Sequence, residues 1–184
     1  MGIDFKIGVA IDSKMLTGQA GRNYSKMLTA SYKEAGLFVE GEVAKKTPVN
    51  TGRLRKSISS RVRGTGFRQY GQVFSPLEYS RYIEEGQLPH LPPEKPIMLW
   101  VSRKLSAVKA KLKAMLVGTP GVTIKMPAQK MKRKAVWAIR SKIAKVGTKG
   151  VHMFKKVFDA PLTGKTVRDI FFRNTTRFIQ KLNL

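Results

Sequence analysis

A helical period dominates the first third of the chain. Apolar and small residues recur there at intervals of four, three, four and four, and this stripe consists of Leu28, Tyr32, Ala35, Val39 and Val43. The spacing places the stripe on one side of an α-helix and predicts a long amphipathic helix that buries it. The helix is expected to end at Lys45-Lys46, whose cations suit the negative end of the helix dipole. Gly36 lies inside it and costs about 1 kcal/mol relative to alanine, which suggests close packing there.

Alternating patterns predict strands before and after this helix. The stretch from Phe5 to Asp12 alternates and predicts a first strand, whose apolar face would carry Phe5, Ile7, Val9 and Ile11. After the helix, one side of an extended chain would carry Leu54, Lys56, Ile58, Ser60 and Val62, and the other side is largely basic. Gly64-Thr65-Gly66 predicts a turn and residues 67–74 the returning strand, which together form a hairpin.

The helix and the hairpin meet at Thr47-Pro48-Val49-Asn50-Thr51-Gly52. Pro48 has no N–H and pushes the residue before it towards extended angles, so the helix cannot continue through it. The Asn-Thr-Gly sequence that follows tolerates left-handed angles and can bond nearby backbone. The segment therefore predicts a tight helix-to-strand corner.

The second half of the chain predicts further helices. Pro76 can open a short helix that Gly86 closes, and the proline-rich residues 88–93 predict an extended connector. Helical spacing predicts amphipathic helices over residues 96–116 and 129–146, with Gly147 as the cap of the second, and the two would form an antiparallel hairpin. The inward residues of the second helix are expected to be Met131, Ala135, Ile139, Ile143 and Val146. A last helix is predicted by Val167, Phe171, Phe178 and Leu182.

These elements predict an α+β fold. A small, mostly antiparallel sheet would be packed by the long N-terminal helix, with a basic helical hairpin and a C-terminal helix added. At 184 residues the chain suits one domain with an appended helical element. We expect an α+β core with the helix-corner-hairpin motif over residues 1–94. A basic helical extension and C-terminal helices that pack on the core would follow over residues 95–184.

Charge points to a negatively charged partner. The formal net charge is +25, and between Lys95 and Phe158 there are 17 Lys or Arg and no Asp or Glu. Ordinary surfaces intersperse both signs, so contact with a polyanion or an acidic protein is favoured over a merely solubilising face. The candidate contact residues are Lys109, Lys111, Lys113, Lys130, Lys132, Arg133, Lys134, Arg140, Lys142 and Lys145.

Motifs for catalysis or cofactors are weak. Gly164-Lys165-Thr166 imitates the end of a phosphate-binding loop, but Asp159 stands where that loop needs glycine. The two histidines are far apart, so neither a metal site nor a cofactor is expected, and an enzyme is the least favoured class. Trp100 and Trp137 could stack on bases, although packing in the core or between subunits is the favoured interpretation.

The chain is not expected to cross or anchor in a membrane. Its longest purely apolar run is Ile97-Met98-Leu99-Trp100-Val101, far short of the roughly 20 residues that span a bilayer. The N-terminal residues also lack the basic and apolar regions of a secretory signal. The absence of cysteine excludes disulfides and fits a reducing compartment.

The corner also carries a family resemblance. Thr47-Pro48-Val49-Asn50-Thr51-Gly52, then Leu54-Arg55 and Ser57-Ile58, resembles a segment of the tail-completion or head–tail joining proteins of long-tailed bacteriophages. Residues 79–86, Tyr-Ser-Arg-Tyr-Ile-Glu-Glu-Gly, resemble the helical turn with glutamate-x-glycine that follows in this family. Thr47 and Asn50 replace the usual alanine and aspartate. The resemblance implies an architectural role for Pro48, Thr51, Gly52, Leu54, Ser57, Tyr79, Tyr82 and Gly86.

The resemblance also implies a function. The protein would be a structural virion protein of the phage neck or upper tail, assembled in the host bacterial cytoplasm as a ring, expected to be a hexamer. Its partners would be neighbouring neck, connector or tail-tube proteins, and genome DNA or tape-measure protein in the channel. The alternative is a non-specific nucleic-acid-binding module of ribosomal or nucleoid type.

Overall fold

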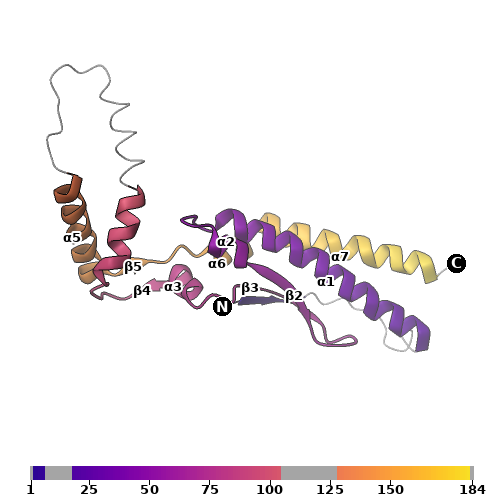
Figure 1. Ribbon diagram of the computed structural model, residues 1–184. Helices are drawn as coiled ribbons and strands as arrows, with labels where there is room; N and C mark the ends of the chain where they lie inside the picture. Colours follow the sequence, from indigo (N-terminus) through magenta and orange to yellow (C-terminus); the bar gives the residue numbers. More distant parts are fainter. Residues whose placement is uncertain (1, 7–17, 105–127, 183–184) are drawn as a thin grey trace, which may run out of the picture. The chain divides into compact units, whose positions relative to one another are not determined.

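The computed structural model describes residues 2–6, 18–104 and 128–182 (Figure 1). The chain divides into two compact units. Unit 1 comprises Met1–Glu85 and Gly150–Leu184, and unit 2 comprises Gly86–Lys149. Unit 2 is therefore an insertion within the sequence of unit 1.

The long helix α1 (Gly18–Lys46) is the centre of unit 1. Its buried residues include all five members of the predicted stripe, and the helix ends at Lys46 as expected. Strands β2 and β3 and helices α6 and α7 all pack against α1. The prediction of one long helix that organises the core is confirmed.

A three-stranded antiparallel sheet lies against α1. Its strands are β1 (Gly2–Phe5), β2 (Ser59–Arg63) and β3 (Tyr70–Phe74), in the order β1-β3-β2. Val73 of the central strand is fully buried, and Gly36 of α1 approaches so closely that an added Cβ would lie 3.0 Å from the Cβ of Ser60. The buried valine of β3 and the close glycine explain why helix and sheet approach each other closely at this point.

Two sequence predictions about the strands need correction. The chain after the corner does not extend at once, because residues Arg53–Ser57 form a short helix, α2, before β2 begins. The first strand begins at Gly2 rather than Phe5, and its predicted continuation over residues 7–12 lies outside the described residues. The hairpin of β2 and β3 with its glycine turn is confirmed, although β3 starts only at Tyr70.

The remaining helices of unit 1 bring the C-terminal part of the chain onto α1. Helix α3 (Tyr79–Glu85) ends at Gly86, which has a φ of 84°. After unit 2 come α6 (Met153–Phe158) and α7 (Pro161–Leu182), which has a proline at its first position. Phe171 and Phe178 are buried beside α1, as predicted, and the α1 and α7 ribbons run alongside each other in Figure 1.

Unit 2 holds the cation-rich helices. Residues 94–104 are helical, and α5 (Ala128–Val146) is followed by Gly147, whose N–H donates to the Ile143 carbonyl at 2.8 Å. Two-residue strands β4 (Gly86–Gln87) and β5 (Thr148–Lys149) pair where the unit begins and ends. The predicted helix over 96–116 is thus described only as far as residue 104. Together the elements confirm an α+β fold.

Candidate interaction surfaces

The corner is built by a left-handed glycine. Gly52 has a φ of 77° and begins α2, and its carbonyl accepts a hydrogen bond from the Lys56 N–H at 3.0 Å. Leu54 is thereby turned inward and is 5% exposed. Pro48 and Thr51 remain at the surface, where they shape the backbone rather than the core. A left-handed residue is what allows the helix α1 and the helix α2 to follow each other so closely.

Hydroxyl groups fix the two ends of this corner. Thr47 is buried, and its Oγ1 donates to the Val43 carbonyl at 2.7 Å and lies 3.4 Å from the Met153 sulfur. Ser57 donates to the Leu54 carbonyl and shares a 2.8 Å hydrogen bond with Ser75 at the end of β3. The threonine that departs from the family pattern therefore contacts α6, and Ser57 joins α2 to the sheet.

Glu84 joins α3 to α6 and was missed by the sequence analysis. It is 3% exposed, and its carboxylate oxygens accept hydrogen bonds from the Phe154 N–H at 3.1 Å and the Lys155 N–H at 3.0 Å. His152, the residue before α6, has a φ of 54° and makes no side-chain cap. The carboxylate thus supplies the N-terminal cap of α6 from another helix. The two exposed tyrosines of α3, Tyr79 and Tyr82, lie outside this contact.

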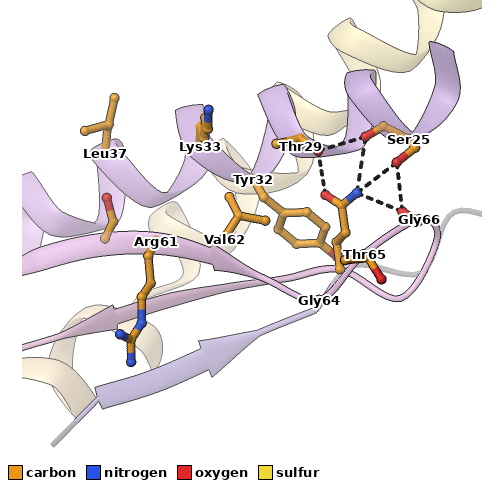
Figure 2. A pocket seen from close by; sticks show the side chains of 12 residues that line it. Ser25, Thr29, Tyr32, Lys33, Leu37, Arg61, Val62, Gly64, Thr65 and Gly66 are labelled. Carbon is orange, nitrogen blue, oxygen red and sulfur yellow. Dashed lines mark hydrogen bonds between the residues drawn. The ribbon is translucent and has the colours of Figure 1, made fainter. Parts of the chain in front are cut away.

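A groove of about 710 Å³ lies between α1 and β2 (Figure 2). Gln69 anchors the hairpin tip at one end of it: its Oε1 accepts from Thr29 at 2.8 Å, and its Nε2 donates to the Gly66 carbonyl at 2.8 Å and to Ser25. Tyr32 lines the space between helix and strand, and Leu37 beside it is 65% exposed. The groove therefore ends at a hydrogen-bonded hairpin tip and is bordered by the apolar side chain of Leu37.

The face of the sheet away from α1 combines cations with aromatic rings. The register places Arg61, Gln72 and Asp4 in one row across the three strands, and Arg61 donates to Gln72 at 2.6 Å. The Arg61 guanidinium also lies 4.1 Å from the Phe74 ring centroid, a cation–π contact. Arg61 points away from α1 in Figure 2. This face is a second exposed surface of unit 1.

A charged cluster holds α7 against α1. Glu34 pairs with Arg173 and accepts a 3.2 Å hydrogen bond from Asn174. Burial raises the pKa of the Glu34 carboxyl, but the hydrogen bonds from Asn174 and Arg173 and the charges of Arg173 and Arg177 outweigh it, so its pKa is lowered. The carboxylate is therefore stabilised in its charged form at neutral pH.

The predicted contact residues on α5 divide into two groups. Arg140 faces its own unit, where it donates to the Pro92 carbonyl at 3.0 Å and pairs with Glu94 at 3.3 Å. The others on this helix are partly or fully exposed, and they are Lys130, Lys132, Arg133, Lys134, Lys142 and Lys145. Lys109, Lys111 and Lys113 lie outside the described residues.

Two apolar residues of α5 differ from their predicted positions. Trp137 is 71% exposed, so it does not pack in the core of the single chain, and its alternative role in a contact between subunits stays a prediction. Val146, predicted to face inward, is 67% exposed, whereas Val136 is 2% exposed. At about 100° per residue, Trp137 shares its side of the helix with Lys130, Arg133 and Lys134. The exposed side of α5 is thus cationic with one large aromatic residue at its middle.

Within the described ranges there is no group of three or more His, Cys, Asp or Glu that could hold a metal ion. No helix in that part of the chain is both long and apolar enough to cross a membrane. The residues around the phosphate-loop imitation, Gly164 to Thr166, are part of helix α7.

Comparison with protein families identifies the segment that contains the corner. Residues 17–86 match the HK97-gp10-like family, described as "Bacteriophage HK97-gp10, putative tail-component". The resemblance to a phage tail family is confirmed. The match covers α1, the corner, the hairpin and α3, and it ends at Gly86, where unit 2 begins. It supports a structural role in a phage tail. Comparisons with curated proteins and with solved structures gave no match.

Proposed function

We propose that this protein is a structural component of the neck or upper tail of a long-tailed bacteriophage, where it completes the tail or joins it to the head. The match of residues 17–86 to a family of phage tail components carries this proposal. The matched segment supplies the central helix and two strands of the sheet, so it forms the scaffold on which the rest of unit 1 packs.

In this proposal the working form is a ring of six copies in the virion. A ring requires a heterologous contact, in which one surface of a copy meets a different surface of the next. Neighbouring neck, connector or tail-tube proteins would bind its two sides, and genome or tape-measure protein would pass through the channel. Such a component acts by shape and contact rather than by chemical conversion.

The oligomer can be tested directly. Native mass spectrometry of the purified chain, combined with negative-stain imaging, should reveal closed rings of one size. Labelled antibody against the chain should decorate the neck or upper tail of phage particles. A protein that stays monomeric up to the highest soluble concentration, or labelling only at the distal end of the tail, contradicts the proposal.

The exposed side of α5 is proposed to bind an acidic neighbouring ring or the genome. Support comes from the exposed cations at Arg133 and Lys134 and from the run of chain without acidic residues around them. Contacts of this kind gain free energy from neutralising fixed negative charge.

A matched pair of variants tests this role of α5. Arg133→Glu with Lys134→Glu should abolish or strongly reduce infectious particles or their DNA retention while rings still form. The control variant, Lys156→Glu with Lys165→Glu, makes the same change in net charge at exposed positions of unit 1. It should leave the number of infectious particles and their DNA retention unchanged. Equal infectivity of the two variants would exclude the proposed role of α5.

A second candidate function is non-specific nucleic-acid binding, which the exposed Trp137 favours. Aromatic stacking on bases next to Lys and Arg is the usual arrangement in proteins that bind single strands. This alternative predicts a monomer whose affinity for single-stranded DNA falls steeply with salt and drops about tenfold or more in Trp137→Ala. A ring whose DNA affinity is unaffected by Trp137→Ala would exclude it.

A further inference from the structure

The three-stranded sheet of unit 1 ends in two strands with one neighbour each. Among residues 2–6, 18–104 and 128–182, β1 and β2 both pair only with β3. In that part of the chain no further strand pairs with their outer backbone N–H and C=O groups, and exposed edges of this kind readily pair with a further chain. Each edge also borders an open hollow. The groove beside β2 is lined by Tyr32 and Val62, and a hollow of about 370 Å³ beside β1 is lined by Phe5 and Val167.

The two edges carry opposite charges on the same face of the sheet. Arg61 and Arg63 are exposed on the β2 edge, and Asp4 is exposed on the β1 edge. Asp4 and Arg61 lie in one row, because both are paired with Gln72 of β3. All three therefore project on the side of the sheet away from α1. Edge-to-edge pairing would bring the carboxylate beside a guanidinium.

The direction of the strands permits such pairing around a ring. Because β1 and β2 both run antiparallel to β3, they run parallel to each other. A rotation about an axis along the strands keeps both the strand direction and the side that faces α1. It therefore brings β1 of one copy parallel to β2 of the next, with Asp4 next to Arg61 or, after a shift of two residues, next to Arg63.

We propose that copies of this chain join through their sheet edges, β1 of one copy pairing with β2 of the next. The occupant of the β2 groove is thus a second copy, and the contact is heterologous, as a ring requires. This inference rests on the proposed ring. A net charge of +25 makes copies repel one another, so an interface that pairs Asp4 with arginine is favoured over one that joins two cationic faces. The exposed Leu37 beside the groove adds apolar surface.

Cysteine crosslinking of the full chain tests this contact, because the natural sequence has no cysteine. Neighbouring strands lie about 4.8 Å apart, within the Cα separation of about 4.4–6.8 Å that a disulfide spans. Within one copy, Asp4 and Arg61 are separated by β3, so their Cα atoms lie about 9.6 Å apart and cannot be bridged directly. Any disulfide between these two positions must therefore join two copies.

The double variant Asp4→Cys with Arg61→Cys should give a ladder of covalent oligomers on oxidation, and Arg63→Cys replaces Arg61→Cys to test the shifted register. A mixture of the two single variants should give covalent dimers, whereas either single variant alone should give almost none. As a charge test, Asp4→Lys should raise the protein concentration needed for ring formation about threefold or more. Asp169→Lys, the same change at an exposed position on α7, should leave it unchanged.

The outcomes separate this inference from the proposed function. Rings that form without a ladder in either register overturn the edge contact and leave the ring standing. A chain that remains monomeric at every concentration overturns both. A ladder together with an Asp4→Lys effect matched by Asp169→Lys would support the strand pairing but overturn the charge pairing.

Discussion

Glu84 should contribute more to stability than any other acidic residue of α3. Glu84→Ala removes the carboxylate that accepts hydrogen bonds from the Phe154 and Lys155 N–H groups, at 3.1 and 3.0 Å. The site is 3% exposed, so water cannot simply replace the lost acceptor. A hydrogen bond to a charged group contributes about 1.5 to 3 kcal/mol, and the two bonds share one carboxylate, so we expect a total loss of about 3 to 4 kcal/mol.

The neighbouring residue provides the control. Glu85 pairs with Arg81 at 3.0 Å, but both side chains are largely exposed. An exposed ion pair contributes about 0 to 1 kcal/mol, so Glu85→Ala should lower the free energy of unfolding by less than about 1 kcal/mol. Glu84→Gln keeps the shape and one acceptor but turns an amide N–H₂ towards a backbone N–H. Its loss of unfolding free energy should lie between those of Glu84→Ala and Glu85→Ala.

Urea denaturation of the three variants, extrapolated linearly to water, measures these differences. Hydrogen exchange at the Phe154 and Lys155 amides gives a local readout, and both amides should exchange faster in Glu84→Ala and at the original rate in Glu85→Ala. If Glu84→Ala and Glu85→Ala agree within about 1 kcal/mol and leave these two amides equally protected, the carboxylate is not the cap of α6 and the reasoning fails.

Three further changes test other contacts. Gly64→Ala should destabilise the hairpin by about 2 to 4 kcal/mol, since φ is 85° and the new Cβ would lie 1.9 Å from a backbone oxygen, whereas Gly66→Ala, with φ of 58° and no atom within 4 Å, should cost about 1 kcal/mol. Coincident urea curves of the two glycine variants would contradict this. Phe171→Ala should cost about 3 to 5 kcal/mol and Phe172→Ala less than about 0.5, because the rings are 2% and 75% exposed. Equal shifts in their thermal melts would show that the aromatic face of α7 is wrongly assigned. Glu34→Gln should cost less than about 1 kcal/mol at pH 7, because the side chain is half exposed. The folded pKa of Glu34 is lowered, so its stabilisation is complete above the unfolded pKa of about 4 and is lost as pH falls through the folded value. The difference between wild type and this variant should therefore shrink at pH 3, and a difference that grows there would reverse the assigned sign.

The sequence predicted the elements whose signals are local. The stripe of α1 repeats over four turns, and the glycine turn of the hairpin lies between two recognisable strands, so both were found from spacing alone. Helix α2 was missed because residues 53–57 also fit an alternating pattern. Its formation depends on the left-handed conformation of Gly52 and on the burial of Leu54, which a local pattern does not contain.

Contacts between distant segments could not be predicted in the same way. Glu84 and the amides that it caps are separated by about 70 residues of sequence, and only the folded chain brings them together. Gln69 bonds to Thr29 of α1, which lies 40 residues earlier in the sequence. Trp137 was expected to pack in the core or between subunits, as tryptophan usually does, yet in the single chain its neighbour Val136 is buried and Trp137 is exposed.

Gly86 and Lys149, the first and last residues of unit 2, pair with each other, so the insertion begins and ends at neighbouring positions. Lengthening a flexible loop twofold costs only about 0.6 kcal/mol in closure entropy, so this insertion is expected to change in length with little effect on the folding of unit 1.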